Sequence, residues 1–233
     1  MARRVRRFFS WLLVLILCAL FFALPCSAEH LDVIRQINTE EKKIALTFDD
    51  GPSRQNLEEI LAVLDEYHAK GTFFVLGCKA EELPEQIKLI ADAGHEIANH
   101  TYSHAYISKL SEKNLQEEVK KTEDILQKIT GVRPRLFRPP GGYISSASLA
   151  VTKEMGYENV MWSLDTRDWS FPSPDKVISC VKKSAKSGDI ILFHDLENKK
   201  LPTAQILRGI LPYLIEEGYS FVTVTELVDC KAE

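Results

Sequence analysis

Short apolar runs alternate along the chain with longer segments in which apolar residues recur every three or four positions. Runs of four or five apolar residues are typical of buried strands in a parallel sheet, and the longer spacing is typical of amphipathic helices. The expected strands cover residues 44–48, 72–76, 96–98, 136–137, 159–163, 190–193 and 219–224. The expected helices lie between them, around residues 57–64, 84–94, 111–131, 145–155, 174–184 and 202–217.

This alternation amounts to about seven strand–helix units, which predicts a parallel sheet. With so many units, we expect an α/β fold of the barrel type, namely a distorted or incomplete (β/α) barrel with about seven parallel strands. No low-complexity tract or internal linker divides the chain, so we expect a single domain. A flavodoxin-like layered sheet is the alternative, disfavoured because no expected strand is followed by a glycine-rich phosphate loop.

The first 28 residues differ from the rest of the chain. Four arginines precede an apolar run over residues 8–24, and Cys26-Ser27-Ala28 has the small residues of a cleavage site. This order predicts a secretory signal peptide cut after Ala28, with an uncleaved membrane anchor through residues 8–24 as the alternative. Either way, we expect the rest of the protein outside the cytoplasm, secreted or facing the cell wall. The expected parts are a leader (1–28), a short N-terminal segment (29–42), the main domain (43–228) and a tail (229–233).

Charge narrows the class of partner. Without the leader, the chain has 25 basic and 33 acidic residues, a net charge of −8. This negative charge argues against binding to nucleic acid and against adhesion to an anionic surface. We therefore expect contact with a membrane only through the N-terminal segment. The negative charge suits an uncharged polymer, or one that becomes cationic as it is processed. We expect a monomer.

Three cysteines lie outside the leader: Cys78, Cys180 and Cys230. Because three is an odd number, at most one disulfide forms within this part of the chain and one thiol is left over. A zinc site built from two cysteines and a histidine would need a close spacing such as Cys-x-x-Cys, which the sequence lacks.

Polar residues with catalytic chemistry follow the ends of the expected strands. Because the carboxyl ends of parallel strands meet at one rim of a barrel, we expect these side chains to lie close together. The group consists of Asp49, Asp50, His100, His104, Arg138, Asp165, Asp168, His194 and Asp195. A plain turn remains the alternative for Asp49-Asp50-Gly51-Pro52, whose composition is also ordinary turn chemistry.

His100 and His104 stand four residues apart. On a helical turn, residues at this spacing project from the same face and can hold one metal ion. A carboxylate with two imidazoles suits zinc, or cobalt or another divalent first-row ion, and leaves coordination positions open for water. We expect His30 and His68 to be surface or capping residues and His95 to be packed without a ligand role.

Three further segments contain residues that could bind or act on a substrate, and each could instead have a purely structural role. Arg138 precedes two prolines and two glycines, which make a stiff loop with room for a ligand near the backbone. Asp165 to Trp169 offers two acids and an aromatic wall for a sugar ring, or merely a polar strand end. His194 closes an apolar strand, where a histidine is often a packing residue.

Five segments together resemble, in order, the motifs of the NodB-type polysaccharide deacetylases, carbohydrate esterase family 4. The resemblance runs from about residue 43 to 227 and implies a distorted (β/α) barrel. It also implies metal-dependent removal of N-acetyl groups from a glycan, with N-acetylglucosamine or N-acetylmuramic acid of peptidoglycan as the favoured substrates and a chitin-like oligosaccharide as another. The matching segments are 47–52, 100–104, 138–142, 165–169 and 191–194.

The resemblance implies a role for each catalytic position. Asp50, His100 and His104 would bind the metal ion. Asp49 would be the general base, oriented by Arg138.

The remaining roles concern the acid and the pocket. His194 would be the general acid, with Asp168 as its carboxylate partner. Asp165 is the alternative partner, and it would also face the substrate. The backbone N–H of Gly141 would bind the oxyanion. Trp169 and Leu192 would line the acetyl pocket. The family often has an aromatic residue at the position of Gly141, so we expect a wider groove there.

Two other functions remain open from the sequence. The same site could release O-acetyl groups as a xylan-type esterase. The protein could also be a catalytically silent glycan-binding homologue, although loss of Asp49 or His194 would have signalled it and both are present.

Overall fold

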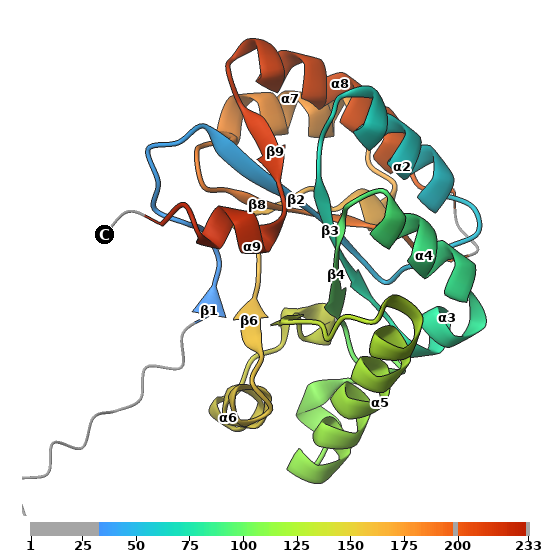
Figure 1. Ribbon diagram of the computed structural model, residues 1–233. Helices are drawn as coiled ribbons and strands as arrows, with labels where there is room; N and C mark the ends of the chain where they lie inside the picture. Colours follow the sequence, from blue (N-terminus) through green and yellow to red (C-terminus); the bar gives the residue numbers. More distant parts are fainter. Residues whose placement is uncertain (1–32, 198–199, 232–233) are drawn as a thin grey trace, which may run out of the picture. The chain divides into compact units, whose positions relative to one another are not determined.

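A single curled sheet organises the computed structural model, which describes residues 33–197 and 200–231 (Figure 1). The nine-stranded sheet has the order β1-β6-β5-β4-β3-β2-β8-β7, with β9 paired to β2, and every ladder is parallel. The expected leader, residues 1–28, lies outside the described residues. The strands are β1 (Val33–Ile34), β2 (Lys43–Asp49), β3 (Gly71–Val75), β4 (Glu96–Asn99), β5 (Leu136–Phe137), β6 (Glu158–Val160), β7 (Leu164–Asp165), β8 (Ile190–His194) and β9 (Ser220–Val222).

Most helices cover the outside of the sheet (Figure 1), whereas Val224 and Leu227 of the last helix pack in the same cluster as Ala45 on its inner face. Helices α7 and α8 pack against each other, α2 packs on α8, and α4 and α6 pack against α5. Within the described ranges, no helix is long and apolar enough to cross a membrane. The helices are α2 (Leu57–Glu66), α3 (Gly77–Glu82), α4 (Pro84–Asp92), α5 (Glu112–Thr130), α6 (Ser146–Glu154), α7 (Pro174–Ser184), α8 (Thr203–Glu216) and α9 (Val224–Val228), with 3₁₀ turns at Ile107–Lys109, Pro140–Gly142 and Asp168–Ser170.

The expected incomplete (β/α) barrel is confirmed. β1 and β7 stand at the two ends of the strand order. The segment after β1 spans the gap, because Gln36 forms an antiparallel bridge with Asp189 and the Ile37 N–H donates to the Gly188 carbonyl at 2.9 Å. A short irregular segment therefore stands where a closed barrel would have a strand ladder.

Strand β2 shows how the sequence places the core. Its alternate residues Ile44, Leu46 and Phe48 pack in the large apolar cluster shared with α2 and α8. Successive side chains of a strand point to opposite faces, so Thr47 and Asp49 face the barrel interior. The same alternation that builds the core thus directs Asp49 inward at the end of the strand.

Helix boundaries follow their capping residues. Ser111 caps α5 by accepting a hydrogen bond from the Asn114 N–H, and Gly131 ends that helix with a φ of 75°. Ser145 caps α6 in the same way. These starts and stops agree with the expected ones because a cap satisfies backbone groups that the helix leaves unpaired.

The expected strand over 159–163 is wrong. The strand ends at Val160, and a separate strand, β7, begins at Leu164. The Met161 N–H donates to the Ile34 carbonyl of β1, whereas the Ser163 N–H donates to the Ile190 carbonyl of β8. The chain passes here from β1 to β8 as its hydrogen-bonding partner. The apolar run therefore forms two short strands instead of one.

The expected last strand, 219–224, is also too long. It ends at Val222, because Thr223 and Glu226 form a capping box that begins α9. The Thr-x-x-Glu spacing is a sequence signature of a helix start and could have been noticed. The short elements β1 and α3 were not expected.

We expect Phe48→Ala to lower the free energy of unfolding by about 3–5 kcal/mol, since truncating a buried phenylalanine leaves a cavity. The Phe48 ring is 1% exposed and stacks on Phe73 and Phe193 at centroid distances of 4.7 and 5.8 Å. Urea denaturation measures the loss. Leu89→Ala on the exposed side of α4 is the control and should cost much less; equal losses would contradict this packing.

Candidate active site

The register of neighbouring strands builds the site. Asp49 at the end of β2 pairs with His194 at the end of β8. Farther along the strand order, Asn99 of β4 pairs with Phe137 of β5, so the residues that follow them, His100 and Arg138, also lie together. The ladders thus bring Asp49, His194, His100 and Arg138 to one rim, as expected.

A pocket of about 320 Å³ opens at this rim. Nine of the eleven residues to which the family resemblance gives a role line it; Arg138 and Asp168 do not, because both are fully buried. Gly142, Trp162 and Leu196 also line the pocket and were not expected. The nine are Asp49, Asp50, His100, His104, Gly141, Asp165, Trp169, Leu192 and His194.

Asp50, His100 and His104 form the one group in the described part of the chain whose histidine, cysteine or carboxylate atoms could hold a metal ion. Their ligand atoms lie within 4.8 Å of one another. Asp50 Oδ1 is 3.4 Å from His100 Nε2 and 3.2 Å from His104 Nε2. This oxygen is buried and has no hydrogen-bond partner among the described residues, which leaves it available to a cation.

The two imidazoles do not share a helical face, so that expectation is wrong. Residues 100–104 form a loop in which Thr101 and His104 have φ values of 70° and 56°. The loop is held from α5, where Glu118 accepts hydrogen bonds from the Tyr102 and Ser103 N–H groups. Left-handed backbone is unfavourable for these residue types, and such conformations concentrate at functional sites.

The imidazole of His100 is held in one orientation. Its Nδ1 lies 2.7 Å from the Arg138 carbonyl oxygen, which can only accept a hydrogen bond. In the neutral imidazole Nδ1 therefore carries the proton, and the lone pair is on Nε2, which faces Asp50. An outer hydrogen bond of this kind is usual for metal-binding histidines.

Burial and charge act in opposite directions at this cluster. Burial raises the pKa of Asp50, but the neighbouring imidazoles of His100 and His104 outweigh it and lower the pKa to about 2. Burial lowers the pKa of His100, but Asp49 and Asp50 outweigh it and raise that pKa. At the more accessible His104, burial prevails over Asp50 and lowers the pKa. Asp50 is thus ionised at neutral pH, as a metal ligand must be.

Arg138 is fully buried and directs Asp49. Its NH1 donates to Asp49 Oδ1 at 2.6 Å and to Thr47 Oγ1 at 2.9 Å. Its NH2 donates to the Met161 carbonyl at 2.8 Å. One carboxylate oxygen of Asp49 is therefore occupied, while Oδ2 lies 3.8 Å from His100 Nε2 on the metal-site side.

His194 is paired with Asp168, not with Asp165. Its Nδ1 lies 2.8 Å from Asp168 Oδ1, and Thr203 donates to Asp168 Oδ2 at 2.7 Å. Asp165 is exposed and accepts a hydrogen bond from the Arg167 N–H. Burial lowers the pKa of His194, but the hydrogen bond and charge of Asp168 outweigh it and raise the pKa above the ordinary value. The sequence did not single out Thr203, because a threonine at a helix start usually indicates a cap.

The substrate side of the pocket matches the expectation for Gly141. Its φ is 62°, and a Cβ placed there would meet no atom within 4 Å, so the groove is open at this point. Leu192 is 3% exposed at the pocket floor, whereas Trp169 is 47% exposed at its edge.

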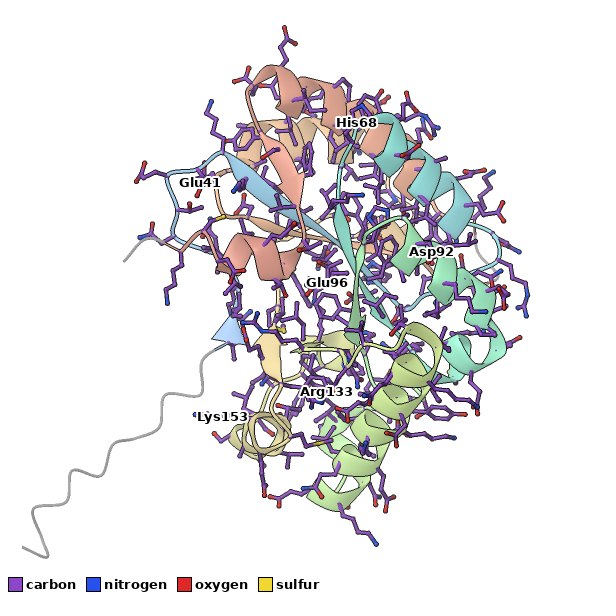
Figure 2. All side chains as sticks on the ribbon, viewed as in Figure 1. Glu41, His68, Asp92, Glu96, Arg133 and Lys153 are labelled. Carbon is purple, nitrogen blue, oxygen red and sulfur yellow. The ribbon has the colours of Figure 1, made fainter. Side chains whose placement is uncertain are left out.

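Of the three histidines set aside from the site, His68 and His95 lie where expected, and His30 lies outside the described residues. His95 is buried, accepts a hydrogen bond from the Gly71 N–H at 3.2 Å and packs on Phe73. His68 is exposed at the outer edge of the molecule (Figure 2). Cys78, Cys180 and Cys230 are free thiols, so no disulfide joins them.

Comparison with known proteins agrees with this geometry. The family model described as polysaccharide deacetylase matches residues 36–160. The chain is 42% identical over 198 residues to a peptidoglycan-N-acetylglucosamine deacetylase of Bacillus cereus, covering 84% of this chain and 92% of the relative.

Two solved structures extend the likeness to the fold. The crystal structure of the Bc1960 peptidoglycan N-acetylglucosamine deacetylase superposes with a TM-score of 0.83 at 35% identity, covering 86% of this chain and 94% of that one. A mutant of a CE4 family pseudoenzyme with restored enzymatic activity has a TM-score of 0.80 at 30% identity, covering 87% and 73%. By the family match and by identity across nearly the whole of a relative, the chain belongs to the polysaccharide deacetylase family, carbohydrate esterase family 4.

Proposed function

We propose that the protein is a metal-dependent hydrolase that removes N-acetyl groups from peptidoglycan, with N-acetylglucosamine as the favoured residue. One observation carries the proposal: a single pocket joins the Asp50–His100–His104 cluster to two buried ion pairs, Arg138–Asp49 and Asp168–His194. The substrate class is supported by the 42% identical relative, whose name specifies that sugar.

Asp50, His100 and His104 would hold a divalent ion, zinc being favoured and cobalt or another first-row ion being the alternative. The fit rests on the buried Asp50 Oδ1 without a hydrogen-bond partner and on the free Nε2 of His100. A bound ion of this kind polarises an amide carbonyl and lowers the pKa of bound water.

Asp49 would act as general base. Arg138 holds Oδ1 of Asp49 in a buried hydrogen bond, so Oδ2 is the oxygen that remains to accept a proton from the attacking water. The same hydrogen bond fixes the orientation of the Asp49 carboxylate.

His194 would act as general acid. Nδ1 is engaged by Asp168, so Nε2 is the nitrogen that donates a proton to the leaving amine. The raised pKa keeps His194 protonated to higher pH. The Gly141 N–H would donate to the developing oxyanion, while Leu192 and Trp169 would enclose the acetyl group.

The aromatic residues around the pocket suit a glycan. Among exposed large hydrophobic residues of the described chain, all four aromatic ones lie within two positions of a pocket-lining residue: Tyr106, Tyr143, Trp169 and Phe171. The exposed aliphatic residues Leu89 and Ile215 lie on helices α4 and α8, and neither they nor Val132 line the pocket. Flat aromatic faces combine apolar area with polar edges, which suits contact with sugar rings.

The same proposal places the protein outside the cytoplasm. A leader over residues 1–28 would direct export, and a deacetylase domain over 43–228 would act on the cell wall, as a monomer. A silent glycan-binding role is disfavoured because the base, the acid and their buried partners are all in place.

Mass spectrometry of peptidoglycan fragments tests the proposal directly. The purified protein with zinc should release acetate and lower the mass of fragments by one acetyl group at N-acetylglucosamine. Loss at N-acetylmuramic acid would change the sugar but keep the activity. Release from O-acetylated xylan alone, or no release from any glycan, would overturn the proposal.

Substitution of His104 should separate metal binding from folding. We expect His104→Ala to lose zinc and activity with little change in melting temperature, because the side chain lies on the rim outside the core. Metal content by mass spectrometry measures this. His68→Asn is the matched control, since its φ of 50° suits asparagine and it should keep full metal content. Full metal content in His104→Ala would refute the ligand assignment.

The pH profile should report the Asp168–His194 pair. Because a general acid must be protonated, kcat falls as pH rises through its pKa. In Asp168→Asn the hydrogen bond and charge that raise the pKa of His194 are lost, so this pKa should fall and the basic limb of kcat should move to lower pH. An unmoved basic limb would show that another group is the acid.

Leaving-group dependence tests whether His194 delivers the proton. His194→Ala should reduce turnover of an N-acetyl substrate by about 10²–10⁴-fold, typical for loss of a general acid. An acetate ester with a good leaving group departs without protonation and should be affected far less. Equal losses on both substrates would assign His194 a structural role.

A further inference from the structure

Asp195, directly after His194, is a buried carboxylate that the mechanism above does not use. Its side chain is 0% exposed. It accepts hydrogen bonds from the Ser53 N–H at 3.0 Å and from the Ser53 hydroxyl at 2.5 Å. A buried carboxylate is costly unless it is fully paired, so its position calls for a structural or functional reason.

Its partners belong to the loop that carries a metal-site residue. Ser53 lies three residues after Asp50, whose φ of 73° is unfavourable for an aspartate outside a turn. The Ser53 hydroxyl also accepts from the Asn56 N–H at 3.0 Å, immediately before α2. Asp195 thus attaches the loop between β2 and α2 to the end of β8.

Close packing at Gly51 strengthens this attachment. A Cβ on Gly51 would lie 2.6 Å from Asp195 Oδ2 and 3.3 Å from Asp195 Cβ and Cγ. Real Cβ atoms do not approach other atoms so closely. Because Ser53 holds the carboxylate in place, it cannot swing aside without losing its hydrogen bonds.

We propose that Asp195 is a positioning residue for the metal site: it holds the Gly51–Ser53 loop so that Asp50 Oδ1 faces His100 and His104. The backbone extends the same connection, since the Asp195 N–H donates to the Asp49 carbonyl at 2.8 Å. One residue therefore couples the Asp49–Asp50 pair to the strand end that bears His194. The inference rests on the proposed metal site.

The chain offers a matched control at the other end of the same strand. Asp189 precedes β8, is 4% exposed, and accepts hydrogen bonds from Ser163 Oγ at 2.8 Å and from the Lys186 N–H at 2.7 Å. It is a buried, paired carboxylate like Asp195, but it lies at the amino end of the strand, away from the pocket. Substitution there should disturb folding without disturbing the metal site.

Zinc affinity of the metal-free full chain, measured by competition with a chromophoric chelator, tests the proposal without relying on activity. Asp195→Asn places an amide N–H₂ against a Ser53 donor, so we expect zinc binding to weaken by about 10–100-fold, the range for residues that orient metal ligands. Asp189→Asn should keep the wild-type Kd, whatever its loss in melting temperature. Equal zinc affinity in wild type and Asp195→Asn would overturn the proposal, as would equal weakening in both variants.

Gly51→Ala provides a second probe if Asp195→Asn does not fold. The added methyl group would lie 2.6 Å from Asp195 Oδ2, so it should displace the carboxylate and weaken zinc binding. Wild-type zinc affinity in Gly51→Ala would contradict the proposal. If wild type binds zinc but releases no acetate from glycans, the proposed function fails while the role of Asp195 stands; if wild type binds no zinc, both fail.

Discussion

The buried ion pair between Arg138 and Asp49 is the interaction on which the rest of the site depends. Arg138 is 0% exposed, so its charge must be met by partners from within the protein. Its guanidinium donates to Asp49, Thr47 and the Met161 carbonyl and stacks on Phe74 at 3.9 Å. Apolar side chains could fill the space that Arg138 occupies, but they would leave Asp49 without a partner to fix its orientation. The interior is therefore built around a charge whose position determines that of the Asp49 carboxylate, the proposed general base.

The same residue connects the proposed base to the candidate metal site. The Arg138 carbonyl accepts from His100 Nδ1, so the side chain and the backbone of one residue orient Asp49 and a proposed metal ligand together. His194 is held in a parallel manner by Asp168, which Thr203 and the Trp169 N–H also contact. In both cases a buried group determines which atom of the neighbouring side chain faces the pocket. Preorganisation of this kind is what stabilises a transition state in a site that excludes water.

Much of this arrangement could be predicted from the sequence because it follows from local rules. The carboxyl ends of parallel strands share one rim, so the polar residues after each strand had to meet, and capping residues such as Ser111 and Gly131 mark their helix ends. What could not be predicted depends on contacts between distant segments. The break at Met161 arises from its bond to β1, and the contact of Thr203 with Asp168 joins the start of α8 to a turn 35 residues earlier. The open space at Gly141 was expected from the family resemblance and agrees with the structure.

The central claim is that strand register brings Asp50, His100 and His104 together as one metal site beside the Arg138–Asp49 pair. Anomalous diffraction at the zinc edge from crystals of the zinc-loaded protein tests this most directly. The account predicts one strong peak within bonding distance of Asp50 Oδ1, His100 Nε2 and His104 Nε2, with Asp49 outside the coordination shell and bonded to Arg138. A peak coordinated by Asp49, a peak elsewhere in the molecule, or no peak at the rim would contradict it.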